Sequence, residues 1–285
     1  MEAVRLVAAA HGPGTPGDHS GATRPTMLAG ASCAHKRIDK WRCLSPARLL
    51  LTVHTMATSL IFLPSPLLGP SVWWPVARIL ADQGWHTMVC GMASPVVTGD
   101  DVLGAFRAAL PVDTDLVLVP HSNAGAYVAE LSVDCPILAA VFVDAVLPPP
   151  SGRIPLAPPA LLDALRERVD ADGLLPPWTE WWDVNDVGVL FPDAPSRAAV
   201  EREQQRIALT YFEGARAVPA GWDAYPGAYL AFGDTYATER DDAAQRGWPV
   251  RTLQQAGHLH QLTAPDQVAE TLCALLGEIG ITATR

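Results

Sequence analysis

Short apolar runs alternate with amphipathic segments over most of this chain, and this alternation constrains the fold more than any other sequence feature. The apolar runs span residues 58–63, 86–90, 115–120, 137–147, 228–232 and 248–253. Segments with helical spacing of their apolar residues lie between or after them, at 72–84, 100–110, 124–131, 237–246 and 266–276. Strands that are apolar on both faces are typical of parallel sheets, which need helices on both sides. The order therefore predicts an α/β fold with a doubly wound, mostly parallel sheet.

Residues 148–226 interrupt this alternation. Two segments in this stretch have helical patterns, at 161–169 and 199–212. Three tryptophans lie between them, at Trp178, Trp181 and Trp182. A mostly helical insertion between two halves of one parallel sheet is typical of a cap over an active site. We therefore expect one domain over residues 56–285, with a helical cap insertion at about 148–226.

The N-terminal segment differs from the rest of the chain in charge. Residues 1–55 hold seven basic and three acidic residues, whereas residues 56–285 hold 13 and 27 and no lysine. The first segment is rich in Gly, Ala, Ser, Thr, Pro and His and shows no sustained period. This composition predicts a flexible N-terminal extension, with a basic docking tail as the less favoured alternative.

The overall composition excludes several classes of protein. At 49% hydrophobic and 18% charged residues, the chain is too apolar for an intrinsically disordered protein. A net charge of −10 argues against nucleic acid or an anionic membrane as the main partner. No apolar run approaches the roughly 20 residues of a membrane span. The five cysteines form neither a C-x-x-C pair nor an even framework. We expect a soluble cytoplasmic protein.

The junction after the run at 115–120 carries the first candidate for catalysis. It reads VPHSNAG at 119–125 and places Ser122 between a predicted strand and a predicted helix. A serine on such a tight turn is exposed at the carboxyl end of the sheet, with the backbone N–H of Asn123 facing the site of an oxyanion. Both glycines of the usual G-x-S-x-G are replaced here, so the motif alone is weak, and helix N-cap is the alternative role for Ser122.

A histidine near the C-terminus supports a catalytic role for this serine. His258 lies in AGHLH (256–260), after the last predicted strand and before the last predicted helix. Ser122 and His258 both fall at carboxyl ends of predicted strands, where α/β sheets bind ligands. A histidine beside a serine acts as the general base that makes the hydroxyl nucleophilic. His260 is expected to form part of the pocket wall.

These residues resemble the α/β-hydrolase superfamily, in particular a bacterial group of Ser-His-Asp type. PHSNAG stands where family members have GHSxGG, and AGHLHQLTAPDQVAETL matches their G-H-x-x-x-L-x-x-P-x-x-V-A ending. SLIFLPSPLLGPSVWWPVARIL stands where the family has a strand, H-G, a loop, Trp and a helix. The resemblance covers essentially all of residues 56–285. It implies the α/β-hydrolase fold, with Ser122 as nucleophile and His258 as base.

The third member of the catalytic group has two candidates. Asp144, in VFVDAVL, ends an apolar strand, and some family branches, such as certain haloalkane dehalogenases, keep their acid there. Asp234, in YLAFGD, lies near the family's other position, but the usual spacing is G-x-x-D, and Gly233 plus three is Tyr236. An orienting carboxylate must be buried beside the imidazole, so Asp144 is preferred by a small margin.

The oxyanion side departs from the family pattern. Where members read H-G-x and donate a backbone N–H from x, this chain reads Pro64-Ser65-Pro66, and proline has no N–H. Losing one such donor typically costs about 10²–10³ in rate. We expect Leu67 N–H to substitute if the loop shifts by one residue, or the Ser65 hydroxyl to donate instead. A hydroxyl residue at the glycine position also resembles the plant hydroxynitrile lyases, which share this fold.

The leading hypothesis is a cofactor-independent serine hydrolase acting on an ester, lactone or thioester of a small hydrophobic compound. Trp178 and its neighbouring tryptophans are expected to line an apolar pocket, with packing of the cap as the alternative. The sequence contains no G-x-G-x-x-G between a predicted strand and a predicted helix, no G-x-x-x-x-G-K and no H-E-x-x-H, and its histidines and cysteines lack metal-ligand spacing. We therefore expect no metal and no cofactor, and a small-molecule substrate as the partner, with no nucleic acid and no membrane.

Two other functions stay open at this point. The first is a non-hydrolytic lyase, cyclase or dehydratase in small-molecule biosynthesis, in which Ser122, His258 and Ser65 move protons; Pro66 is the feature that favours it. The second is a non-catalytic receptor that uses the capped cleft, and no feature of the sequence specifically favours it.

Because every candidate catalytic residue follows Met56, we predict that a variant beginning at Met56 folds and keeps its activity. Its melting temperature should lie within about 2 °C of that of the full chain. Thermal unfolding by circular dichroism and turnover of an activated ester measure the two properties. An insoluble or inactive variant would instead make residues 1–55 a functional element.

Overall fold

A six-stranded sheet is the centre of the part of the chain that the computed structural model describes, namely residues 58–92, 95–112 and 114–283. The predicted extension, residues 1–55, lies outside these ranges. The strands are β1 (Thr58–Leu63), β2 (His86–Val89), β3 (Asp115–Ser122), β4 (Ile137–Ala145), β7 (Gly227–Phe232) and β8 (Val250–Leu253). They lie in the order β2-β1-β3-β4-β7-β8, and every neighbouring pair is parallel. This arrangement confirms the predicted fold class.

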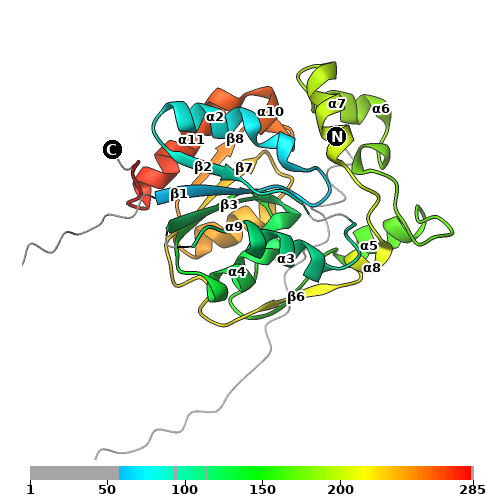
Figure 1. Ribbon diagram of the computed structural model, residues 1–285, viewed down its shortest axis with the longest axis horizontal. Helices are drawn as coiled ribbons and strands as arrows, with labels where there is room; N and C mark the ends of the chain where they lie inside the picture. Colours follow the sequence, from blue (N-terminus) through cyan, green and yellow to red (C-terminus); the bar gives the residue numbers. More distant parts are fainter. Residues whose placement is uncertain (1–57, 93–94, 113, 284–285) are drawn as a thin grey trace, which may run out of the picture. The chain divides into compact units, whose positions relative to one another are not determined.

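Helices cover both faces of the sheet, as the apolar strands require (Figure 1). One face carries α2 (Trp74–Asp82), α10 (His260–Thr263) and α11 (Pro265–Glu278), and the other carries α3 (Gly99–Ala109), α4 (Val128–Asp134) and α9 (Ala237–Gln245). Two 3₁₀ turns, η1 (Pro70–Val72) and η2 (Asn123–Tyr127), precede α2 and α4. None of the helices in the described ranges is both long enough and apolar enough to cross a membrane.

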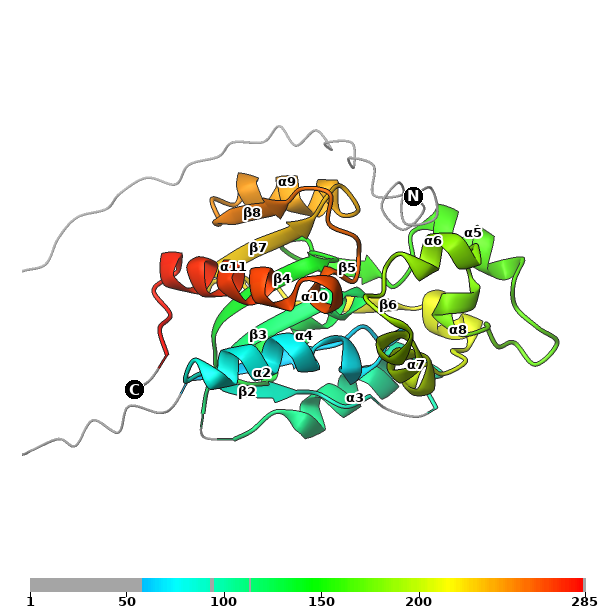
Figure 2. The ribbon, with the colours of Figure 1, turned by 90° about the horizontal axis from the view of Figure 1, so that it is seen from above.

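The residues between β4 and β7 form a separate layer, which we call the insertion (residues 148–226). Its elements are β5 (Gly152–Pro155), α5 (Pro159–Arg166), η3 (Trp178–Glu180), α6 (Val184–Gly188), α7 (Ala194–Glu203), α8 (Leu209–Phe212) and β6 (Ala215–Val218). Figure 2 shows α5 to α8 gathered beyond the edge at which the parallel strands end. The strands β5 and β6 pair antiparallel, so the two ends of the insertion are hydrogen-bonded to each other. Sequence patterning predicted the helical content but not this strand pair.

The helix predicted over 199–212 was wrong in one respect, because it is broken into α7 and α8. Residues 204–208 are extended and bonded to distant parts of the chain. Val96 N–H donates to Gln205 Oε1 at 3.0 Å, and Leu175 N–H donates to the Ile207 carbonyl at 2.9 Å. These tertiary hydrogen bonds outweigh a helical propensity that favoured a continuous helix.

Arg216 links the insertion to α3 and α4 through hydrogen bonds. This β6 side chain is buried and makes two hydrogen bonds to the Glu130 carboxylate of α4, from Nε at 2.8 Å and from Nη2 at 2.9 Å. Its Nη1 donates to Asp100 of α3 at 2.8 Å, and its guanidinium lies 5.5 Å from the centre of the Tyr127 ring. A two-pronged contact of this kind fixes orientation as well as distance.

Gly125 is required by the close approach of η2 to the chain that follows β4. A Cβ added at Gly125 would lie 1.9 Å from the carbonyl oxygen of Val146, and its three nearest atoms all belong to the Val146 backbone. We predict that Gly125→Ala lowers the free energy of unfolding by about 3 kcal/mol, because neither segment can move without disturbing the sheet. Urea unfolding followed by circular dichroism measures this change.

Gly104→Ala is the matched control for that substitution. Gly104 lies on the exposed side of α3, and an added Cβ would have no atom within 4 Å. Alanine there should raise the free energy of unfolding by about 0.5–1 kcal/mol through helix propensity. Equal effects of the two substitutions would contradict the argument from close approach.

Candidate active site

Ser122 occupies a strained turn between β3 and η2. Its backbone has φ 57° and ψ −130°, in a region that a residue other than glycine rarely adopts. The pairing of β3 with β4 shifts register between His121 and Ser122, and Val146 N–H donates to the Ser122 carbonyl at 3.0 Å. This turn places the Ser122 hydroxyl at the carboxyl end of the sheet, in the wall of a pocket. The structure thus bears the geometry that the sequence motif predicts for a nucleophile.

His258 and Asp144 form a buried pair beside this serine. His258 Nδ1 lies 2.6 Å from Asp144 Oδ2, and both side chains are almost fully buried. The other carboxylate oxygen of Asp144 accepts a hydrogen bond from Phe232 N–H at 3.0 Å. With its Nδ1–H given to Asp144, the His258 imidazole has Nε2 left to accept a proton.

Burial acts on the two members of this pair in opposite senses. It lowers the pKa of His258 from 6.5 to about 4, because the charged imidazolium is poorly solvated there. Burial also raises the pKa of Asp144 above its usual range, and the hydrogen bond from Phe232 N–H opposes that shift. At neutral pH the imidazole is therefore uncharged, which is the state that a general base needs.

The structure does not bring Asp234 to the imidazole. The Asp234 side chain is 83% exposed and forms an ion pair with Arg240, whose Nη1 lies 2.9 Å from Oδ1. The chain turns at Gly233, which has φ 67°, and Asp234 follows too early to point inward. Between the two acidic candidates, the geometry favours Asp144.

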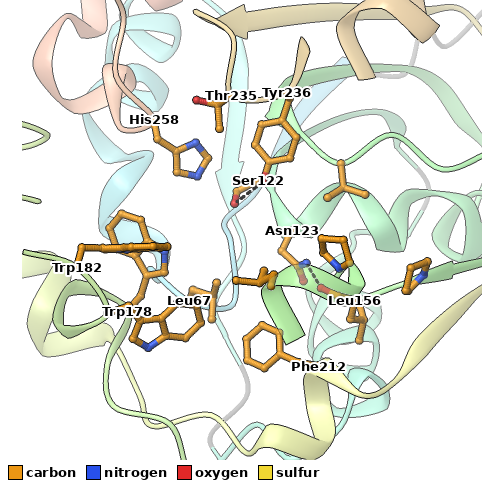
Figure 3. A pocket seen from close by; sticks show the side chains of 15 residues that line it. Leu67, Ser122, Asn123, Leu156, Trp178, Trp182, Phe212, Thr235, Tyr236 and His258 are labelled. Carbon is orange, nitrogen blue, oxygen red and sulfur yellow. Dashed lines mark hydrogen bonds between the residues drawn. The ribbon is translucent and has the colours of Figure 1, made fainter. Parts of the chain in front are cut away.

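The inward position is taken by Tyr236, a residue to which sequence reasoning gave no role. Its hydroxyl oxygen lies 3.3 Å from Ser122 Oγ, and its side chain is 1% exposed (Figure 3). Among the described residues, this is the hydrogen bond that Ser122 Oγ makes, and none joins it to His258. The spacing from Gly233 was the signal, because Tyr236 stands where the usual G-x-x-D pattern has its carboxylate.

Asn123 links the serine turn to the insertion. Its backbone N–H begins η2 and has no partner within that helical turn. Its side-chain Nδ2 donates to the Leu156 carbonyl at 2.9 Å, and its Oδ1 accepts from the Tyr211 hydroxyl. The Tyr211 oxygen in turn accepts from Tyr127 at 3.0 Å. These two bonds hold the side chain in place, and the backbone N–H of Asn123 is the donor that follows Ser122 in the chain.

The loop that was expected to supply a second oxyanion donor is bonded within itself. Ser65 is fully buried, and its Oγ accepts from Leu67 N–H at 3.4 Å. The Ser65 carbonyl accepts from the N–H groups of Leu68 and Gly69. Leu67 contributes its side chain to the pocket, whereas Ser65 is not among the residues that line it. Neither the Ser65 hydroxyl nor Leu67 N–H is therefore presented to a substrate.

The pocket at Ser122 is narrow and apolar. Its volume is about 30 Å³, and Figure 3 shows Trp178, Trp182 and Phe212 facing Ser122 across it. None of the side chains described in its wall is Asp, Glu, Lys or Arg. Trp178, which was expected in the pocket wall, is one of the residues that line the pocket. Its ring centre lies 6.3 Å from that of His258.

A wider cavity of about 460 Å³ adjoins this pocket. The two share Trp182, Thr235 and His258 in their walls. His258 is therefore accessible from the wide cavity as well as from the narrow pocket.

His121 supports His258 from behind. The two rings lie 4.6 Å apart, and His121 Nε2 lies 3.0 Å from the His258 carbonyl oxygen. Burial and the neighbouring His258 hold the pKa of His121 well below its usual value, so its uncharged ring donates Nε2–H to that carbonyl. Sequence reasoning quoted His121 as part of the motif and gave it no role. His260 was expected in the pocket wall but does not line the pocket. Its Nε2 lies 2.9 Å from Oε1 of Gln267, a residue of α11.

Within the described ranges, no three histidine, cysteine or acidic side chains gather closely enough to hold a metal ion. The groups around Ser122 are those of acid–base chemistry, namely a neutral imidazole, a buried carboxyl group and a phenol.

Comparisons with solved structures show the same fold. A variant of tomato methylketone synthase I, complexed with beta-ketoheptanoate, matches with a TM-score of 0.59 and 12% identity over 79% of this chain and 98% of that one. Polyneuridine aldehyde esterase matches with a TM-score of 0.54 and 16% identity over 78% of this chain and 99% of that one. The pyrethroid hydrolase PytH matches with a TM-score of 0.59 and 17% identity over 78% and 97%.

The sequence itself matches a family model, although no curated protein matches it. The model describes the alpha/beta hydrolase family and matches residues 60–271, which include most of β1, the serine turn, the insertion and the loop of His258. The chain therefore belongs to the alpha/beta hydrolase family.

Proposed function

We propose that this protein is a serine esterase that hydrolyses an ester, lactone or thioester of a small, uncharged, hydrophobic compound. The observation that carries the proposal is the 2.6 Å pairing of His258 Nδ1 with the buried Asp144 carboxylate next to a strained Ser122. A serine hydroxyl is a weak nucleophile by itself, and a neutral imidazole held by a carboxylate is the arrangement that activates it.

The proposed reaction proceeds in two halves. Ser122 Oγ bonds to the carbonyl carbon while its proton passes to His258 Nε2, and the π electron pair of the carbonyl moves to oxygen. The tetrahedral species then loses its alkoxide or thiolate, which takes the proton from His258. A water molecule repeats the sequence on the acyl-serine and releases the acid and the free hydroxyl. Asp144 orients the imidazole and stabilises its charged form during each half.

The proposed oxyanion site uses the start of η2. Asn123 N–H is the first free backbone donor after Ser122 and points from a helix N-terminus. The side-chain hydrogen bonds of Asn123 to Leu156 and Tyr211 keep this donor in place. A donor fixed in advance stabilises developing charge without reorganisation.

The pocket suggests which part of the substrate lies where. The narrow side has aromatic walls and no ionic side chain, which suits an apolar or aromatic acyl group. His258 must protonate the leaving oxygen, so the leaving group lies on the His258 side and reaches the wide cavity that His258 also lines. Two proteins of similar fold are named as an esterase and as a pyrethroid hydrolase, which agrees with this substrate class.

A non-hydrolytic lyase, cyclase or dehydratase is the second candidate, and one observation favours it. The first-strand loop offers no backbone N–H to an oxyanion, because Pro66 has none and Leu67 N–H is bonded to Ser65. A protein of similar fold is named as a methylketone synthase. Against this candidate, the Ser65 hydroxyl that it would use lies outside the pocket wall.

Replacing Ser122 by alanine should abolish hydrolysis and covalent labelling by a fluorophosphonate. We expect kcat for p-nitrophenyl butyrate to fall by at least about 10⁴-fold, because the nucleophile is lost. Ser132→Ala is the matched control, because this α4 hydroxyl bonds the Ala129 carbonyl, and it should leave labelling unchanged. Full hydrolysis by Ser122→Ala would refute the esterase proposal. Absence of any acyl-serine in the unaltered protein, seen by mass spectrometry, would favour the second candidate.

The pH dependence of kcat/KM should report the lowered pKa of His258. Because burial disfavours the imidazolium, His258 stays a base below pH 6.5, and its protonation should lower activity as the pH drops through about 4. The measurement uses an uncharged ester and checks that the protein recovers full activity after exposure to each pH.

The other groups near His258 allow this profile to be assigned. His121 and Tyr236 stay uncharged across the range, because burial lowers the pKa of the first and raises that of the second. Glu239, near Asp144, has its pKa raised to about 7 by burial. A step near pH 7 that disappears in Glu239→Gln belongs to Glu239. Burial also raises the pKa of Asp144, so an acid limb near pH 6.5 contradicts the lowered pKa of His258 only if it persists in both Glu239→Gln and Asp144→Asn.

A further inference from the structure

The proposed esterase site has one oxyanion donor where two are typical. Asn123 N–H approaches from the start of η2. The opposite donor should come from the loop after β1, but Pro66 has no N–H and Leu67 N–H is bonded to Ser65 Oγ. In a pocket without charged side chains, a second donor is worth about 10²–10³ in rate, so its source matters.

Tyr236 brings a hydroxyl to this position from another element. It lies between β7 and α9, as the residue that immediately precedes α9. Its oxygen is 3.3 Å from Ser122 Oγ, its ring centre is 5.9 Å from that of His258, and it lines the pocket (Figure 3). The hydroxyl thus lies within reach of any oxygen that becomes attached through the carbonyl carbon to Ser122.

A phenylalanine at position 236 would keep the structural contributions of Tyr236, because these come from its ring and its backbone. Within the described part of the chain its hydrogen bond is with Ser122. The ring is buried in the wall, and the backbone carbonyl of Tyr236 accepts from Arg240 N–H in the first turn of α9. These two contributions depend on the ring and the backbone. What the hydroxyl adds is its contact with the reacting oxygen.

Burial also keeps this hydroxyl in its donating form. It raises the pKa of Tyr236 well above the usual value, and the negative charges that Asp144 and Glu239 carry when ionised act in the same direction. The phenol is therefore protonated at every pH at which the protein is expected to work.

We propose that Tyr236 is a further catalytic residue, whose hydroxyl donates a hydrogen bond to the substrate oxygen that becomes the oxyanion at Ser122. The inference rests on the proposed esterase function. In the free protein the Tyr236 and Ser122 hydroxyl groups share a hydrogen bond. When the Ser122 proton passes to His258 and the C–O bond forms, the electron pair of the carbonyl moves to its oxygen, and Tyr236 donates to that oxygen while keeping its own proton. Tyr236 and Asn123 N–H then hold the oxyanion from two sides.

Tyr236→Phe tests this assignment, because it removes the oxygen and keeps the ring. With p-nitrophenyl butyrate, kcat should fall by about 10²-fold while KM stays within about threefold, because the lost hydrogen bond is made in the transition state. The inhibition constant of a trifluoromethyl ketone, which forms a tetrahedral adduct with the serine, should rise by a similar factor. A merely structural role would move KM and the melting temperature together with kcat.

Tyr225→Phe is the matched control. Tyr225 is a half-buried tyrosine whose hydroxyl is buried, and it lines a separate cavity with Ser132 and Trp222, so loss of this hydroxyl should leave kcat unchanged. If Tyr236→Phe keeps wild-type kcat while Ser122→Ala is inactive, the inference is overturned and the esterase proposal stands. If Ser122→Ala remains active, the esterase proposal itself fails.

A crystal structure of the unaltered protein after fluorophosphonate labelling gives a second test that does not depend on the variant folding. The phosphonyl oxygen of the Ser122 adduct should lie about 2.6–3.0 Å from Tyr236 Oη. An adduct in which that oxygen faces Asn123 N–H and lies beyond hydrogen-bond distance of Tyr236 would overturn the assignment.

Discussion

The close approach of η2 to the chain after β4 is the contact on which the rest of the site depends. Gly125 has no side chain, so the Val146 carbonyl can lie where a Cβ would be, and Val146 N–H bonds the Ser122 carbonyl. This packing holds Ser122 at φ 57°, a conformation that is unfavourable for serine in isolation. Asp144, the second-last residue of β4, is itself at φ 42°. One strand pair, β3 with β4, thus positions both Ser122 and Asp144.

The strain at these two residues is maintained by hydrogen bonds to neighbouring strands. The Tyr229 hydroxyl of β7 accepts from Ala145 N–H at 3.1 Å and donates to the Ala145 carbonyl at 2.6 Å, which locks the turn after β4. Phe232 N–H, at the end of the same strand, fixes the Asp144 carboxylate. Because β7 lies next to β4, the position at which β7 ends also determines how close the Tyr236 hydroxyl lies to Ser122. Regular sheet geometry is therefore converted into a defined arrangement of reactive groups.

Sequence patterning predicted the sheet because a strand that is buried on both faces consists of a continuous apolar run. Residues 58–63, which form β1, are an example. The same patterning also placed Ser122 and His258 at the ends of strands. The β5–β6 pair and the break between α7 and α8 escaped prediction, because hydrogen bonds to distant residues decide them and leave no local period. Tyr236 escaped for a related reason. Its spacing from Gly233 was visible, but the direction of its side chain depends on how β7 ends.

The apolar wall of the narrow pocket gives weight to each hydrogen-bond donor near Ser122. Burial keeps His258 uncharged, which favours proton abstraction, but the apolar and aromatic side chains of this wall offer few polar contacts to the oxyanion of the proposed reaction. The negative charge that forms must then be stabilised by fixed dipoles, and each is worth more than it would be in water. A single backbone N–H would leave that charge poorly solvated. Pro66 removes the usual loop donor, and the Tyr236 hydroxyl, 3.3 Å from Ser122 Oγ, is the donor that we propose in its place.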